Sequence, residues 1–476
     1  MPLPVISVTR MRAWEKATWA AGQTEQEVIR QVGHAVARVA LRLTRPGDLI
    51  LILAGRGNNG EDARAALNHL PARQVEMLGI SDPARDLQDL EAMLSRHPAL
   101  VIDGLFGIGL NRPLGQEWIS FINRINSAGV KVLAVDVPSG LDPETGAAAG
   151  AAVQAAVTLA VGAPKFGMLA PSAWPYVGRL EVASDVGLLH CPETSDLEWT
   201  EPGDFAGFPP PRAAATHKGT YGHLAVLAGS LGFHGAAVLA ARAAQRAQPG
   251  LITLHALPSV YLVVASQLQA VMVRPWEDQA DLPGSFDAVL VGPGLAAPEM
   301  PEALKVRTRD LWQHAPVPVI ADASALDWLP SGPVPEKALR VITPHPGEAA
   351  RLLAISTPEV QADRPAALRN LSRKMGNTWV VLKGHQTLVG RSTGKIFINP
   401  SGNPHLAQGG SGDVLSGFIA GLLSQPELQP DPLTALRYAV WQHGASADHL
   451  QDNRSNWIVE NLLEILGSTA PMDITS

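Results

Sequence analysis

The sequence NPHLAQGGSGDVLSG, residues 403–417, is a glycine-rich loop that runs directly into an apolar segment. Glycines allow successive backbone N–H groups to converge on one point. A helix that starts near Asp413 would add the positive end of its dipole at that point. The loop is therefore predicted to hold an anion such as a phosphate group.

Asp413 stands at the end of this loop, where a carboxylate would repel bound phosphate oxygens. Its position there suggests a base that takes the proton of a hydroxyl group as that hydroxyl attacks phosphorus. The alternative is an ordinary aspartate that caps a helix after a glycine-rich turn. The loop by itself leaves both interpretations open.

Three further motifs in the second half each follow a short apolar run that reads as a buried strand: GPG at 292–294, TPHPGE at 343–348 and KGHQT at 383–387. This repeated order predicts a mostly parallel three-layer α/β/α sheet with its site across the carboxyl edge. His345 could be a metal ligand, but only Glu348 lies at helical spacing from it, and zinc usually needs three protein ligands. A substrate contact or a turn histidine is therefore expected.

The first half repeats the order. Apolar runs at 49–53, 99–102 and 132–135 lead into AGRGNNGED (54–62), DG (103–104) and DVPSG (136–140), after a helical lead-in from 10 to 43. A Rossmann-like, doubly wound three-layer domain is predicted. Asp103 and Asp136 could simply cap the turns that follow their strands. Alternatively, a carboxylate, an amide oxygen and a hydroxyl from different strand ends could form an oxygen-ligand cage for a hard cation.

Composition limits the classes of protein that the chain can be. Its 476 residues are too many for one ordinary core, and 46% hydrophobic against 17% charged residues is ample for packed α/β cores. A net charge of −7 without a Lys/Arg-rich stretch favours neither a nucleic-acid nor a membrane partner. The single cysteine, Cys191, fits a reducing cytosol, and no apolar run has the length of a membrane span. We expect a cytoplasmic protein.

Prolines mark the expected domain boundary. Periodicity fails between Cys191 and Thr216, a stretch that contains PPP at 209–211. Prolines at this density stiffen an extended connection. We place the boundary near 205–215 and divide the chain into residues 1–208 and 209–476.

Together with Asn399-Pro400 and the loop at 403–417, the order of the second-half motifs resembles the ribokinase-like fold, and within it the ADP-dependent NAD(P)H-hydrate dehydratases. With the first half included, the chain from about Met11 to Leu466 resembles the bifunctional NAD(P)H-hydrate repair enzymes. The resemblance implies that Asp413 is catalytic and that substrate contacts come from Ala236, Gly294, His345 and Asp413. Nucleotide binding is implied for Lys383, Gly384, His385, Gln386, Thr387, Gly409, Gly410, Ser411 and Gly412.

In the first half the resemblance is to the epimerase domain of the same enzymes. It implies that Asn59, Asp103 and Ser139 bind potassium and that Asp136 is catalytic. The implied substrate-binding positions are Asn58, Asn59, Gly60, Glu61, Asp62, Gly107, Ile108, Gly109, Leu110, Asn111, Arg112, Pro113 and Asp136.

The first turn departs from the family pattern, because Glu61 and Ala63 stand where the family usually has glycines. A Glu61 carboxylate that points into the turn would strain it and repel a pyrophosphate by about 1–3 kcal/mol. A carboxylate that points outward would leave the loop able to function normally. The resulting expectation is a domain that binds the hydrate and potassium but epimerises slowly. Lys165, which follows the strand at 157–161, is expected to be a solvated loop lysine, although it could approach the phosphates of the substrate.

The implied function is repair of hydrated nicotinamide cofactors, NADHX and NADPHX: dehydration of the S hydrate with ADP or ATP, and interconversion of the R and S hydrates. Implied cofactors are ADP (or ATP), K⁺ and Mg²⁺, and the protein is expected to be a homo-oligomer. The same loop and base would also serve a ribokinase-type kinase that acts on a vitamin-precursor alcohol. Such a kinase would lack the N-terminal domain.

Overall fold

The computed structural model describes residues 2–110, 112–277, 282, 284–335 and 338–470. Contacts divide the chain into two compact units, Leu3–Asp196 and a unit that starts at Leu197. The division lies earlier than the expected boundary after residue 208. The reason is β8 (Leu197–Trp199), which pairs in parallel with β17 (Ile396–Ile398) and so belongs to the second sheet.

The first unit contains a parallel sheet with the strand order β3-β2-β4-β5-β6-β7. Its strands are β2 (Leu49–Ala54), β3 (Gln74–Gly79), β4 (Leu100–Gly104), β5 (Lys131–Val135), β6 (Val157–Val161) and β7 (Arg179–Ala183). The predicted Rossmann-like, doubly wound domain is confirmed. Edge strand β3 was not expected, because its residues are half-buried or exposed and show no apolar run.

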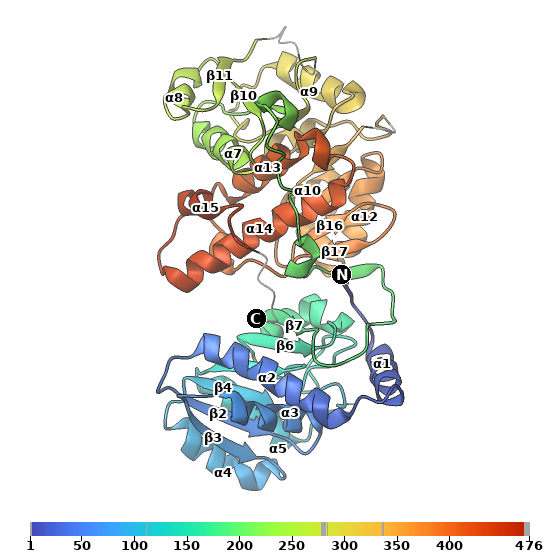
Figure 1. The fold of residues 1–476 in the computed structure, drawn as a ribbon, viewed down its shortest axis with the longest axis vertical. Coiled ribbons are helices and arrows are strands. Elements are labelled where there is room, and N and C mark those ends of the chain that lie inside the picture. Colours follow the sequence, from blue (N-terminus) through green and yellow to red (C-terminus); the bar gives the residue numbers. More distant parts are fainter. Residues whose placement is uncertain (1, 111, 278–281, 283, 336–337, 471–476) are drawn as a thin grey trace. The chain divides into compact units, whose positions relative to one another are not determined.

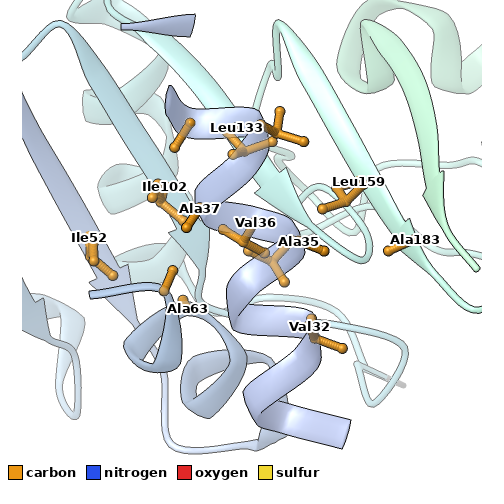
Figure 2. Close-up of a cluster of buried hydrophobic side chains, with 14 of the residues drawn as sticks. Val32, Ala35, Val36, Ala37, Ile52, Ala63, Ile102, Leu133, Leu159 and Ala183 are labelled. Atoms are coloured by element: carbon orange, nitrogen blue, oxygen red, sulfur yellow. The ribbon is translucent and has the colours of Figure 1, made fainter. Parts of the chain in front are cut away.

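Helices cover both faces of this sheet (Figure 1). The short strand β1 (Leu3–Pro4) precedes α1 (Val8–Ala20), α2 (Glu25–Leu43), α3 (Asn58–Ala66), α4 (Pro83–Leu94), α5 (Gln116–Ser127) and α6 (Trp174–Val177). The helical lead-in is therefore two helices, separated at Gly22, which has a φ of +98°. Along β2, Ile50 and Ile52 belong to a hydrophobic cluster with residues of α2 and α3, in which Figure 2 labels Ile52 near Ala63, while Leu51 and Leu53 belong to a second cluster with residues of α4 and α5.

The second unit contains a mixed sheet in which the strands follow the order β8-β17-β16-β15-β14-β13-β12-β9-β10-β11. The pairs are parallel except where β16 joins β15 and β17, so the prediction of a mostly parallel sheet is confirmed. Its other strands are β9 (His223–Leu227), β10 (Leu251–Ala256), β11 (Met272–Pro275), β12 (Ala288–Val291), β13 (Val319–Ala321), β14 (Arg340–Ile342), β15 (Trp379–Leu382) and β16 (Leu388–Gly390). Since β9 and β12 to β15 run in parallel, their carboxyl ends share one edge.

The helices of the second unit place the glycine-rich loop at that edge. They are α7 (His234–Arg246), α8 (Tyr261–Ala265), α9 (Glu302–His314), α10 (Pro346–Leu353), α11 (Thr357–Ala362), α12 (Arg364–Lys374), α13 (Ser411–Leu423), α14 (Pro432–Asn453) and α15 (Val459–Ile465). Gly417 and Gly421 let α13 approach α7 closely, because a Cβ at these positions would lie 2.1 Å from the Ala240 carbonyl oxygen and 2.6 Å from that of Ala244. Figure 1 shows α7, α13 and α14 packed together. Among the described residues, no helix combines the length and apolarity that crossing a membrane requires.

Candidate active sites

The glycine-rich loop ends at the first turn of α13. Gly410 precedes the helix with a φ of +93°, and a Cβ there would lie 2.4 Å from Leu239 Cδ1, so this position requires glycine. The first N–H groups of a helix have no partner within the helix and face the loop. Buried His443, in α14, donates from Nε2 to the Ser411 carbonyl oxygen at 3.0 Å. Burial lowers the pKa of His443 to about 4, so the ring is neutral at pH 7.

Asp413 lies in the first turn of α13 with a strongly shifted acidity. Burial raises its pKa to about 7, and the nearby carboxylates Asp322 and Glu348 add to the rise while Lys383 opposes it. A carboxyl group that titrates near neutrality is suited to take and return a proton. A simple helix cap would have no need of such a shift, so the arrangement favours the base.

Lys383 connects this turn to two carboxylates. Its Nζ lies 2.8 Å from Asp322 Oδ1 and 3.9 Å from Glu348 Oε2. A Cβ on Gly412 would lie 3.2 Å from the same Nζ, so the ammonium stands beside the loop. Burial lowers the pKa of Lys383, but Asp322 and Glu348 outweigh that effect and leave the pKa raised, so the side chain is a cation.

Asp322 and Glu348 were not expected as site residues. Asp322 is 1% exposed and follows β13 directly, a position at the carboxyl edge that the sequence could have indicated. Glu348 is buried in the first turn of α10, where its Oε2 accepts from the His345 backbone N–H at 2.7 Å. In return, His345 Nδ1 accepts from the Gly347 N–H at 3.0 Å. His345 is thus the N-cap of α10, which matches the turn histidine.

The loop from Lys383 to Thr387 is held by a residue that sequence reasoning missed. Buried Arg364 donates to the carbonyl oxygens of Leu382 at 3.0 Å and of Lys383 at 3.2 Å, and also to that of His385. Gly384 has a φ of +123° and Gln386, without being glycine, a φ of +51°. Five donors in a rigid fork suit a guanidinium to this task, so Arg364 fixes the course of the loop.

Ala236 and Gly294 meet at the same edge of the sheet. A Cβ on Gly294, whose φ is +65°, would lie 2.3 Å from the Phe233 carbonyl oxygen and 3.0 Å from Ala236 Cβ. Ser230 Oγ donates to the Gly294 carbonyl oxygen at 2.7 Å. The structure therefore brings Ala236 of α7 close to Gly294, where the chain leaves the neighbouring strands β9 and β12, and it brings Lys383, which follows β15, close to Gly412 and Asp413 at the start of α13.

In the first unit, the residues expected to bind potassium are close together. Ser139 Oγ donates to Asp103 Oδ1 at 2.6 Å, and the Ser139 N–H donates to Asp103 Oδ2 at 2.9 Å. Asn59 Nδ2 donates to the Phe106 carbonyl oxygen at 2.9 Å, which also lies 3.3 Å from Ser139 Oγ. Asn59 Oδ1 is buried and has no hydrogen-bond partner. Burial raises the pKa of Asp103 to about 6.

These oxygens fit a potassium ion. Hard monovalent cations take carbonyl, amide, hydroxyl and carboxylate oxygens. A buried amide oxygen without a hydrogen-bond donor costs free energy unless another partner, such as an ion, binds it. Asn59 Oδ1 is such an atom, and Nδ2 of the same side chain contacts the Phe106 carbonyl oxygen, as Ser139 Oγ does. Among the described residues, no group of three or more His, Cys, Asp or Glu side chains is arranged for a metal ion.

Glu61 lies outside the turn that it was expected to disturb. Residues Asn58 to Asp62 form the first turns of α3, so Glu61 has a helical backbone, and its side chain is 53% exposed and pairs with Arg64 at 2.9 Å. Ala63 is fully buried, and a Cβ on Gly104 would lie 2.4 Å from the Ala63 Cβ. Of the two orientations that the sequence left open for Glu61, the structure has the outward one, because an i, i+3 partner draws the side chain outward.

The other expected contacts lie around the same turn. Asn58 is exposed and donates to Glu25 of α2, and Gly60 packs against Gly55, whose oxygen would lie 2.1 Å from an added Cβ. Gly107 abuts Asn59, and the Ile108 carbonyl oxygen accepts from Arg12 at 3.2 Å. The loop continues through Gly109, Leu110, Arg112 and Pro113. These four described residues make no side-chain hydrogen bonds to one another, and Asn111 lies outside the described residues.

Asp136 follows β5 and meets a buried lysine. Lys165 is 0% exposed, and its Nζ lies 2.6 Å from Asp136 Oδ1. The expectation of a solvated Lys165 was therefore wrong: the chain after β6 turns back over the end of β5, and sequence alone could not show this. Burial raises the pKa of Asp62 well above its ordinary value, with Asp136 and Glu15 adding to the rise, and Glu15 is shifted upward in the same way.

The fold and these two sites define a class of protein: a Rossmann-like unit joined to a ribokinase-like unit that carries a glycine-rich loop, a lysine and an aspartate of raised pKa at its sheet edge. The NAD(P)H-hydrate dehydratase family model matches residues 224–467, and the YjeF-related protein N-terminus model matches residues 74–167.

Relatives cover nearly the whole chain. The bifunctional NAD(P)H-hydrate repair enzyme Nnr of Gloeobacter violaceus is 35% identical over 94% of this chain and 93% of its own. The enzyme of the same name from Coxiella burnetii is 33% identical over 92% and 93%. A solved structure of the ADP/ATP-dependent NAD(P)H-hydrate dehydratase of Bacillus subtilis, crystallised with ATP and Mg²⁺, is 33% identical, covers 56% of this chain and 94% of that one, and has a TM-score of 0.50. The chain belongs to the family of bifunctional NAD(P)H-hydrate repair enzymes.

Proposed function

We propose that the C-terminal unit dehydrates the S hydrates of NADH and NADPH at the expense of ADP or ATP, and that the N-terminal unit interconverts the R and S hydrates. The observation that carries the first activity is Asp413, a carboxyl group with a pKa of about 7 beside the Lys383 ammonium and the glycine-rich loop. Family membership supports the same assignment.

The dehydration divides into two steps. A hydroxyl on a saturated ring carbon is a poor leaving group, so it is first phosphorylated. Asp413 takes the hydroxyl proton as the oxygen attacks the terminal phosphorus of the nucleotide, and the bond from that phosphorus to the rest of the nucleotide breaks. Phosphate then leaves the carbon, driven by the electron pair of the ring nitrogen, and a proton is lost from the neighbouring carbon to form the double bond.

Lys383 and the loop hold the transferring group. The ammonium and the N–H groups from Gly409 to Gly412 would face its oxygens, where charge develops. Mg²⁺ usually binds through nucleotide phosphates with one or two carboxylates, and Asp322, Glu348 and Asp413 are the carboxylates near Lys383. When bound, the ion would neutralise phosphate charge.

The epimerisation needs a base for the hydroxyl group and an acid for the ring nitrogen, which are both bonded to the carbon that is inverted. If Asp136 removes the hydroxyl proton, the oxygen forms a carbonyl as the bond from carbon to ring nitrogen breaks, and the nitrogen takes a proton. Closure on the opposite face of the carbonyl returns both protons and gives the other epimer. Asp62, whose pKa burial raises well above its ordinary value, would supply the proton for nitrogen.

Potassium would be held by Asn59, Asp103 and Ser139, together with the Phe106 carbonyl oxygen. The ion would contribute positive charge at the carboxyl edge of the first sheet, where the pyrophosphate of the substrate is expected. A homo-oligomer and a cytoplasmic location stay predictions.

Incubation of separated R and S hydrates with ADP or ATP tests both activities. With the enzyme and nucleotide, we expect the S hydrate to regain the absorbance of the reduced cofactor directly. The R hydrate should do so only as fast as the enzyme converts it into the S hydrate. A phosphorylated product that persists would instead identify a kinase. The fused N-terminal unit and the family match make that alternative less favoured.

A further inference from the structure

Lys165 is a charged side chain in a place where charges are rarely found. It is fully buried, and lysine is almost never buried without a partner. Its Nζ contacts Asp136 Oδ1 at 2.6 Å and the Val161 carbonyl oxygen at 2.9 Å. An apolar residue would fill the same space without the cost of removing an ammonium from water, so packing by itself gives no reason for a lysine here.

The partner carboxylate is held as tightly as the lysine. Asp136 has a φ of +62°, a strained conformation for a residue other than glycine, and strain of this kind gathers at functional sites. Its Oδ1 also accepts from the Val161 N–H at 3.2 Å. Both contacts fall on Oδ1, which fixes the plane of the carboxylate.

Two more acids surround this pair. Glu15 of α1 interacts electrostatically with both Asp136 and Lys165, and Asp62 of α3 interacts with Asp136 and Glu15. When several carboxyl groups share a site, repulsion makes some of them keep their protons. The buried Lys165 ammonium forms its ion pair with Asp136, at 2.6 Å.

We propose that Lys165 is a positioning residue for the epimerisation: its ammonium pairs with the Asp136 carboxylate and holds it in place as the base. This rests on the epimerase activity proposed above. Lys165 itself is covered and touches no substrate; it acts through Asp136. The proton taken from the hydroxyl group goes to Asp136 and returns from it, so the lysine neither gains nor loses one.

The test uses full-length Lys165→Met. With R hydrate and ADP we expect kcat/KM for conversion to fall by about 100-fold or more, in the range for loss of an effective base. The acidic limb of the pH–rate profile should move upward by about one pH unit, because the ionised base is harder to form without its counter-ion. Dehydration of S hydrate by the same preparation should be unchanged. Lys131→Met, which removes an exposed lysine at the start of β5, is the matched control and should leave both rates as in wild type.

A double variant separates positioning from structure. In an Asp136→Asn background, Lys165→Met should cost about threefold or less, since a residue that acts through Asp136 has nothing left to act on. The double variant also removes both charges, so it should fold even if Lys165→Met leaves an unpaired buried carboxylate that prevents folding.

Additive losses with an unmoved acidic limb would overturn the inference, as would a Lys165→Met enzyme within about threefold of wild type. In both cases the wild type still epimerises and the proposed function stands. A wild type that leaves R hydrate unconverted while it dehydrates S hydrate would overturn the proposed epimerase together with this role for Lys165.

Discussion

Lys383 Nζ and Asp322 Oδ1 lie 2.8 Å apart, although the two residues are 61 positions apart and follow strands that flank β14 in the sheet. The ion pair crosses the carboxyl edge and brings the ammonium beside Gly412. Glu348 lies on its other side at 3.9 Å. Two carboxylates thus hold the Lys383 ammonium in position beside the loop where we expect phosphate to bind.

Asp413→Asn is expected to keep the fold and ADP binding but to lose dehydration of S hydrate. Asparagine has nearly the same shape and cannot accept the hydroxyl proton, and loss of a general base usually costs about 10²–10⁴-fold in rate. Single-turnover recovery of reduced-cofactor absorbance, with ADP affinity from calorimetry, measures both. A rate within about threefold of wild type would remove Asp413 from the role of base.

The pH dependence should follow the same group. With a pKa of about 7, Asp413 is protonated below neutrality, so kcat for dehydration should rise as the pH passes through about 7. Stability should move in the opposite sense. Between the ordinary pKa of an aspartate and about 7 the folded protein holds a proton that the unfolded chain has lost, so this contribution to stability falls as the pH rises through that window.

Asp413→Asn should remove that part of the pH dependence. Calorimetric unfolding of the C-terminal unit between about pH 5 and pH 8 should therefore show the variant gaining stability relative to wild type as the pH rises. Parallel curves for the two proteins would contradict a raised pKa at this position.

Lys383→Ala is expected to weaken nucleotide binding by about tenfold or more, because a charge-assisted contact to phosphate typically contributes about 1.5–3 kcal/mol. It should also lower stability, since Asp322 and Glu348 lose their cation. Isothermal calorimetry with ADP provides the measurement. Lys305→Ala, at a surface ion pair on α9, is the matched control. If Lys383→Ala binds ADP as tightly as wild type, Lys383 contributes to the stability of the fold and not to nucleotide binding.

Glu61→Gly should leave the rate of R-to-S conversion within about threefold of wild type, because the carboxylate is turned toward Arg64 and away from the turn. Ala63→Gly should destabilise the N-terminal unit by about 1 kcal/mol, the usual cost of glycine in a helix, and more for the lost contact with β4. Rates and melting temperatures of the two single variants test these expectations. A marked acceleration of R-to-S conversion by Glu61→Gly would instead indicate that the Glu61 carboxylate points into the turn and hinders binding of the substrate.

Potassium should stabilise the N-terminal unit beyond the effect of ionic strength. An ion that binds only the folded state raises the free energy of unfolding by RT ln(1 + c/Kd), where c is the concentration of the ion, and the unfolding temperature rises with it. The comparison is thermal unfolding in KCl and in NaCl at equal concentration. Asn59→Ala should abolish the difference, since it removes the buried oxygen that has no other partner. Equal unfolding temperatures for wild type in both salts would contradict the site.

Local patterns in the sequence predicted much of the fold. Continuous apolar runs that end in glycine placed β2, β4, β5, β12 and β15, since a strand buried on both faces must be apolar along its length. Edge strand β3 and short β8 have no such run and were missed, and with β8 the domain boundary moved.

Sequence by itself determined the two α/β units, the anion loop at 403–417, and Asp413, Asp103 and Asp136 as strand-end or loop acids. These depend on local chemistry: glycine conformations, apolar periodicity and polar residues where strands end. Only the tertiary structure decided which acids meet which cations. It paired Lys165 with Asp136 and Lys383 with Asp322, and it turned Glu61 outward to Arg64. The reason is physical: the energy of a charge depends on distance and burial, and both are set by chain segments far away in the sequence.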